Sequence, residues 1–124
     1  MRFFSLIFFF FSFEIFAVDY KPVEDFFMDY LTNLRQKNFD MAKDKLSSAY
    51  LKNLGGEEGL KKLISMQDGK KERPKVKLKI EKGVDEIYFV EIQDFSTKHN
   101  HYRYVVIKEN NKFKINGTQS FEDK

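Results

Sequence analysis

The sequence predicts an α+β fold in which N-terminal helices pack on a four-stranded antiparallel meander sheet, in a cone-like arrangement. Two observations support this prediction. Apolar residues recur at helical spacing between residues 23 and 66. After residue 75, runs of β-branched and aromatic residues are separated by short polar turns. Because no helical pattern separates these runs, neighbouring strands are expected to pair along the chain. A length of 124 residues has room for one such domain.

The first helix is predicted to begin near Pro22, a residue suited to the first helical turn. Its apolar stripe consists of Val23, Phe26, Phe27, Tyr30, Leu31 and Leu34. A break follows at residues 38–40, with Asp40 as a candidate N-cap. A second helix is expected from Met41 to Asn53, with Ala49 on its buried side. The third is expected from Glu57 to Met66.

The first strand is predicted at residues 75–82, which alternate strictly between lysine or glutamate and aliphatic residues. A row of lysines would protect a sheet edge from unwanted pairing. Gly83 is expected to reverse the chain in a turn of two or four residues. The strand that follows covers residues 87–92.

The last two strands are predicted at residues 102–107 and 112–115, joined by Asn110-Asn111. Asparagine tolerates positive φ, which a two-residue type I′ hairpin turn requires. This turn would place Val106 opposite Ile115.

Strand alternation then assigns side chains to two faces of the sheet. The face toward the helices is expected to hold Val76, Leu78, Ile80, Ile87, Phe89, Tyr104, Val106, Phe113 and Ile115. The opposite face is expected to hold Tyr88, Val90, Ile92, Arg103, Val105 and Ile107. Both faces are apolar in the middle, so each needs a cover.

Residues 1–17 are interpreted as a signal peptide, and residues 18–124 as the single domain. Arg2 provides the positive start, residues 3–13 the apolar run, and Ala17 a small residue at the cleavage point. We therefore expect a periplasmic or secreted protein. An uncleaved anchor is the alternative, although residues 3–18 fall short of the roughly 20 residues that span a bilayer. Membrane association, including a role in a secretion assembly, is expected only if this segment is retained.

Two stretches resemble the nuclear-transport-factor-2-like superfamily, a cone-shaped relative of the cystatin fold, and in particular its small exported bacterial members. Residues 38–42 are similar to the family's break between its first helices. Residues 105–115 are similar to its closing hairpin, although the family usually has Gly and Trp where this chain has Asn111 and Phe113. The resemblance spans residues 23–115. It implies the cone-like fold and dimerisation through the outer sheet face, and it leaves enzyme and binding module equally open.

An aromatic pocket is one candidate site. Its predicted lining is Phe26, Phe27, Tyr30, Phe89, Glu91, Tyr104 and Phe113. These rings could hold a small apolar ligand, or they could form a packed core that needs no ligand. Enzymes of the superfamily use an acid or His inside the cone as a general base, and Glu91 is the candidate here. The alternative is that Glu91 lies at the solvent-exposed opening of the cone and has no catalytic role.

The other candidate site is the outer sheet face formed by Tyr88, Val90, Ile92, Arg103, Val105 and Ile107. An exposed apolar patch of this kind usually marks an interface, so we expect a homodimer or a protein partner. The net charge of +3 is too small and dispersed to indicate nucleic acid. His99 and His101 alone make a poor metal site. We predict no catalytic residue, metal or cofactor.

The sequence thus favours an exported, non-enzymatic binding or interaction module that self-associates through the outer sheet face. The alternative is a small carrier of apolar ligands or a minimal enzyme that uses the cone pocket.

Cleavage is tested by the mass of the protein after export from a bacterial host. We expect the mature chain to begin at Val18. A mass that includes residues 1–17 would contradict cleavage and favour the anchored alternative.

Overall fold

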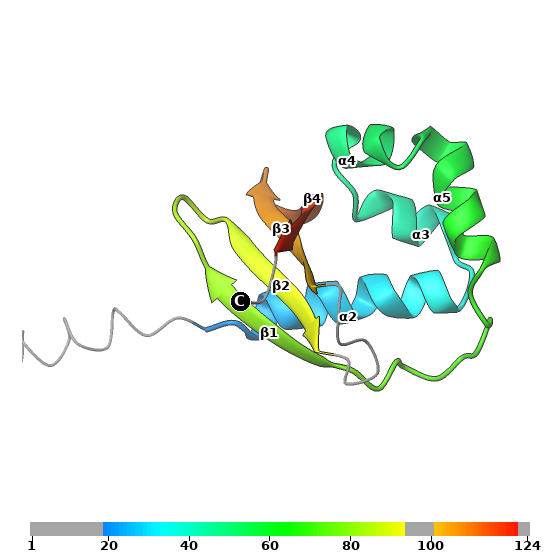
Figure 1. The fold of residues 1–124 in the computed structure, drawn as a ribbon, viewed down its shortest axis with the longest axis horizontal. Coiled ribbons are helices and arrows are strands. Elements are labelled where there is room, and N and C mark those ends of the chain that lie inside the picture. The colour runs from blue at the N-terminus through cyan, green and yellow to red at the C-terminus, as the bar shows by residue number, and fades with distance from the viewer. Residues whose placement is uncertain (1–18, 94–100, 122–124) are drawn as a thin grey trace, which may run out of the picture.

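A computed structural model describes residues 19–93 and 101–121 (Figure 1). The helices come first: α2 (Lys21–Arg35), α3 (Phe39–Asp44), α4 (Ser48–Asn53) and α5 (Gly56–Ser65). The strands follow: β1 (Lys77–Lys82), β2 (Tyr88–Gln93), β3 (His101–Glu109) and β4 (Lys112–Phe121). All neighbours pair antiparallel in the order β1-β2-β3-β4. The predicted α+β class and the meander are therefore confirmed.

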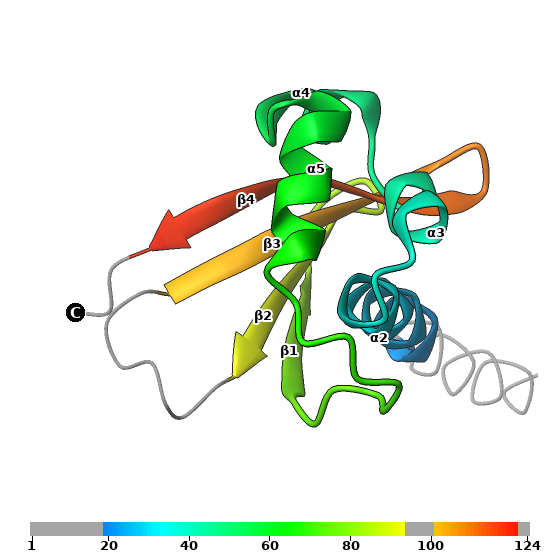
Figure 2. The ribbon, with the colours of Figure 1, turned by 90° about the vertical axis from the view of Figure 1, so that its right-hand side faces the viewer.

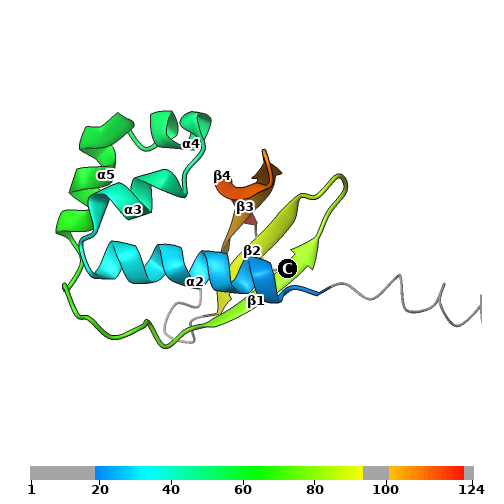
Figure 3. The same cartoon turned by 180° about the vertical axis from the view of Figure 1, so that it is seen from behind.

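Helix α2 lies against one face of the sheet, as Figures 1 and 3 show from opposite sides. Its stripe is buried as the spacing predicts, with Phe27 and Tyr30 at 0% and 1% exposure. Two ring contacts join the helix to the sheet: Phe27 lies 4.9 Å from Tyr104, and Phe26 lies 5.6 Å from Phe113, between ring centroids. Helix and sheet thus share one aromatic core.

The predicted helix from Met41 to Asn53 is in fact two helices, α3 and α4, with a break at residues 45–47. The break pairs with the outer edge of β4. The Ile115 N–H donates to the Lys45 carbonyl at 2.8 Å, and the Ser47 N–H donates to the Ile115 carbonyl at 2.9 Å. The Ser47 hydroxyl then caps α4 by accepting from the Tyr50 N–H. Because the helical phase restarts at Ser47, Ala49 is exposed rather than buried.

The hairpin between β3 and β4 is as predicted. Asn110 and Asn111 both adopt positive φ, and Val106 pairs with Ile115. Strand β4 extends further than expected, to Phe121. A bulge allows this: Val105 pairs with Gly117, so Asn116 is the extra residue on β4.

The turn between β1 and β2 differs in length from the prediction, and this difference exchanges the two faces of β2. Lys82 pairs with Tyr88, so the turn runs from Gly83 to Ile87 and has an odd number of residues. Its ends are joined by the Gly83 N–H, which donates to the Ile87 carbonyl at 2.7 Å. A change of one residue in turn length moves every side chain of the next strand to the other face.

The predicted faces of β2 were therefore wrong. Tyr88, Val90 and Ile92 face the helices, where Val90 is completely buried. Val90 pairs with Ile80 on one side and with Tyr104 on the other. Phe89 and Glu91 lie on the outer face instead. The predicted faces of β1, β3 and β4 are confirmed, since Leu78, Ile80, Tyr104, Val106, Phe113 and Ile115 all belong to the core or pack against it.

A glycine in α5 generates a stability prediction. A Cβ added at Gly59 would lie 1.7 Å from the Leu54 carbonyl oxygen, so the backbone would have to move. We expect Gly59→Ala to destabilise the protein by about 3 kcal/mol in chemical denaturation. Gly117→Ala is the control, because nothing lies within 4 Å of its added Cβ, and it should change the stability by less than about 0.5 kcal/mol. Equal stabilities for the two variants would contradict the packing of α5 on Leu54.

Candidate functional site

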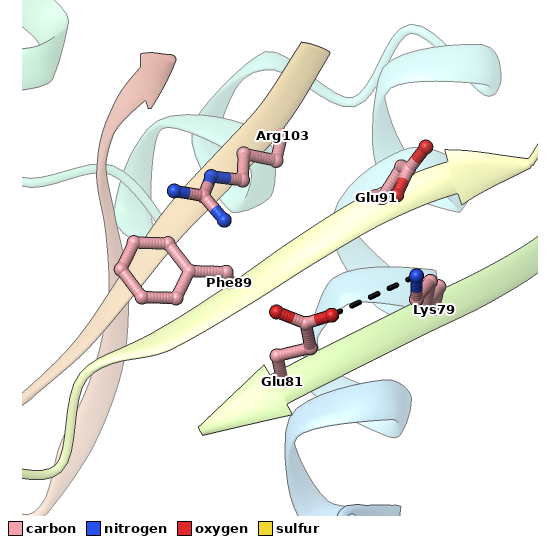
Figure 4. Close-up of a pocket in the computed structure, with 5 residues that line it drawn as sticks. All are labelled: Lys79, Glu81, Phe89, Glu91 and Arg103. Carbon is pink, nitrogen blue, oxygen red and sulfur yellow. Dashed lines mark ion pairs between the residues drawn. The ribbon is translucent and has the colours of Figure 1, made fainter. Parts of the chain in front are cut away.

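The outer face of the sheet carries a shallow hollow of about 90 Å³. Five side chains from β1, β2 and β3 surround it (Figure 4): Lys79, Glu81, Phe89, Glu91 and Arg103. Strand alternation brings them together. Glu81 pairs with Phe89, Lys79 with Glu91, and Glu91 with Arg103. Two members of this group, Phe89 and Glu91, were expected on the other face.

Two neighbouring residues, Arg103 and Gly83, hold the Phe89 ring in place on the outer face. The Arg103 guanidinium lies 4.2 Å from the centroid of its ring, which is cation–π distance. The ring also lies over Gly83, where an added Cβ would come within 2.9 Å of the ring atom Cε2. The Arg103 Nε donates to Gln119 Oε1 at 2.9 Å, so the guanidinium is itself oriented. Gly83 thus leaves the space that the Phe89 ring occupies, and the ring forms one wall of the hollow.

An apolar strip continues from Phe89 across β3. Val105 lies directly opposite Phe89, and Ile107 follows on the same face two residues later. These side chains are half-buried and are not among the residues of the core cluster. Of the predicted interface residues, Arg103, Val105 and Ile107 lie on this face, whereas Tyr88, Val90 and Ile92 do not. The strip is therefore smaller than the sequence predicted.

Charges of both signs lie beside the apolar strip. Lys79 Nζ and Glu81 Oε1 are 3.7 Å apart, and both side chains are more than half exposed. Glu91 adds a second carboxylate and Arg103 a second cation. The hollow is thus lined by two carboxylates, two cations and one aromatic ring.

The predicted pocket lining is brought together only in part. Phe26, Phe27, Tyr30, Tyr104 and Phe113 do converge, between α2 and the sheet. A water-sized void beside Phe27 or Tyr30 would leave exposed area on them, and they have almost none. These two rings are therefore packed core. Glu91 and Phe89 lie on the opposite face of the sheet, so this core contains no general base from Glu91.

The core does gather three tyrosines with perturbed hydroxyl groups: Tyr30, Tyr50 and Tyr104. Burial raises the pKa of Tyr50 to about 12, with a smaller contribution from the nearby Tyr104 hydroxyl. Burial also raises the pKa of Tyr30 and of Tyr104. These hydroxyls therefore stay neutral at physiological pH.

A second hollow, of about 350 Å³, was missed by the sequence reasoning. It lies between the first half of α2 and the start of β1 and is lined by Lys21, Glu24, Asp25, Met28, Arg73, Val76, Lys77, Leu78 and Gln93. The α2 residues are spaced at i, i+3, i+4 and i+7, so they share one helix face. This spacing could have indicated that the four residues form one site. However, three of them are charged, which is equally typical of a helix face exposed to solvent.

His99 lies outside the described residues, and His101 begins β3. Within residues 19–93 and 101–121, no group of three or more His, Cys, Asp or Glu side chains could hold a metal ion. No helix in the same ranges is long and apolar enough to cross a membrane.

Comparisons with known proteins found no matching family model, no matching curated protein and no matching solved structure.

The buried tyrosines predict alkaline instability. Tyr50 stays neutral in the folded chain, whereas in the unfolded chain it ionises at its ordinary value of 10.0. Raising the pH from about 10 to 12 therefore favours the unfolded state, by about 1 kcal/mol per pH unit for this group. We expect Tyr50→Phe to reduce the slope of unfolding free energy against pH by that amount, measured by urea denaturation. Below pH 9 the slopes should agree. Identical slopes between pH 10 and 12 would contradict the burial of this hydroxyl.

Proposed function

We propose that this protein is an exported, non-catalytic interaction module that self-associates through the outer face of its sheet. The observation that carries the proposal is the apolar strip of Phe89, Val105 and Ile107 on a face that none of the described helices covers (Figures 1 and 3). Apolar residues that are fixed in place and border charged groups are typical of interface cores with polar rims.

The shape of the strip favours a partner side chain beside Val105. On one side Val105 is bordered by Phe89, and on the other by Gly117 of β4. Nothing lies within 4 Å of the position that a Gly117 Cβ would occupy. The surface therefore has open space over the β4 backbone beside Val105, which an apolar side chain of a partner could occupy.

The charges favour a second copy as that partner. A twofold dimer brings the same patch of two subunits together, so the patch must complement itself. Glu81 and Glu91 on one copy can face Lys79 and Arg103 on the other, because the hollow carries two charges of each sign. A face of one sign would repel its own copy.

Export rests on the N-terminal pattern at residues 1–17, and dimerisation through the sheet also follows from the resemblance to the nuclear-transport-factor-2-like superfamily. The alternative, an apolar-ligand carrier or cone-pocket enzyme, would require Glu91 and the aromatic rings to share one cavity. Glu91 lies across the sheet from Phe27 and Tyr30, and this separation supports the interaction module over the carrier or enzyme.

Light scattering on the mature chain tests the proposal. We expect the wild-type protein to dimerise, and Val105→Lys to weaken the dimer at least about tenfold, because a buried lysine would have to be desolvated at the centre of the interface. Val84→Lys is the matched control, since Val84 is 76% exposed in the turn before β2, and it should leave the dimer intact.

A wild-type chain that stays monomeric at high concentration would contradict the proposal. So would a dimer that Val105→Lys and Val84→Lys affect equally.

A further inference from the structure

The hollow beside α2 has an apolar floor and charged walls. Met28, which is only 7% exposed, and the half-buried Val76 and Leu78 supply its apolar side chains. Glu24 and Asp25 stand on the helix, and Arg73 and Lys77 stand on the chain entering β1. A volume of about 350 Å³ is within the range of ligand sites, roughly 300 to 1,000 Å³.

Several of these charges lack a partner in the described parts of the chain. Asp25 pairs with Lys21 at 3.2 Å. In contrast, the side chains of Arg73 and Lys77 form no hydrogen bond, ion pair or ring contact with any other described residue. Two cations at the mouth of an apolar hollow are therefore available to an acidic ligand.

The hollow adjoins the edge of the sheet. Strand β1 is the outermost strand, paired only with β2 within the four-stranded sheet, and Figure 2 shows it beside α2. Every second backbone N–H and C=O of an edge strand points away from the sheet. An extended peptide can pair with these groups as an additional strand, which is a common mode of peptide recognition.

We propose that the edge of β1 binds an extended peptide with alternating acidic and apolar residues. In a paired strand, directly opposed side chains lie on the same face. Residues opposite Lys77 and Lys79 lie on the outer face, where carboxylates complement the lysines. Residues opposite Leu78 lie on the helix side, where apolar side chains enter the hollow above Met28.

A second copy of β1 offers the same edge less charge complementarity than an acidic peptide. In a parallel, in-register pair, Lys77 and Lys79 would lie opposite their own copies, and like charges directly opposite each other destabilise a strand pair. In an antiparallel pair, Glu81 of one copy can lie opposite only one of the two lysines, whereas the peptide offers a carboxylate to each. The peptide site shares Lys79 with the proposed dimer face, but its other contacts, Lys77 and the hollow, lie at the sheet edge, while Val105 lies at the centre of the outer face. Either proposal can fail without the other.

The test uses the mature chain and a capped, fluorescent pentapeptide, Val-Glu-Val-Glu-Val. Its sequence reads the same in both directions, so it fits parallel or antiparallel pairing. We expect measurable binding by fluorescence anisotropy, and loss of binding for Val-Lys-Val-Lys-Val. Lys77→Glu should weaken binding of the acidic peptide by about tenfold. Lys62→Glu, which makes the same change in charge on the exposed side of α5, should leave it unchanged.

Two N-methylated peptides test strand pairing itself. One is methylated on its valines and the other on its glutamates, with side chains and charge unchanged. Because only one of these two sets of N–H groups can point toward β1, one peptide should lose binding and the other should retain it. Equal binding of the two would overturn strand addition.

Backbone amide chemical shifts of the wild-type protein give a readout that needs no variant. Binding of the acidic peptide should shift the amides of residues 77–82 and of Met28. Absence of binding, or shifts confined to Phe89, Arg103 and Val105, would overturn the proposal.

Discussion

The odd-numbered turn from Gly83 to Ile87 decides which side chains of β2 meet the helices. With an even number of residues, Phe89 and Glu91 would point at α2, and a carboxylate would lie in the core. With the observed turn, Val90 takes the central position, between Ile80 and Tyr104. Burying an unpaired carboxylate costs far more than burying valine gains, so the core itself favours this register. The same turn places Phe89 outside, where Gly83 leaves room for its ring.

The rest of the core is arranged around α2 and β4. The rings of α2 pack on Tyr104 and Phe113, which pins the helix to β3 and β4. The break between α3 and α4 then pairs with Ile115, so the far edge of the sheet is joined to the helical layer by backbone hydrogen bonds. The β4 bulge follows at Asn116, whose side-chain oxygen accepts from the Ser47 hydroxyl at 2.9 Å. One edge of the sheet is therefore closed by the chain itself, whereas no residue of 19–93 or 101–121 adds a strand to the β1 edge.

Much of this fold could be predicted from local patterns. The α2 stripe, the lysine row of β1 and the Asn110-Asn111 turn are each set by a few neighbouring residues. The helix break at residues 45–47 could not, because its hydrogen-bond partner, Ile115, lies far along the chain. The length of the β1–β2 turn could not be predicted from local patterns either. Asp85 and Glu86 adopt positive φ. Aspartate tolerates this conformation but glutamate is not enriched in it, so the pair is a weaker turn signal than Gly or a pair of asparagines.

The prediction of the candidate site was right for β3 and wrong for β2, for the same reasons. Arg103, Val105 and Ile107 were placed correctly because the hairpin that sets their strand was readable. Tyr88, Val90 and Ile92 were misplaced because the turn before them was not readable. One residue of turn length decides that Val90 is buried in the core and that Phe89 lies half-buried on the outer face. The hollow beside α2 depends on the approach of a helix to a distant strand, which no local pattern reports.

Thiol labelling of single-cysteine variants tests this register most directly, because the chain has no cysteine of its own. At concentrations too low for self-association, Phe89→Cys should react readily with a thiol reagent, while Val90→Cys should react only when the protein unfolds. The opposite order of reactivity would mean that β2 faces the other way, and both the core and the outer face described above would have to be redrawn.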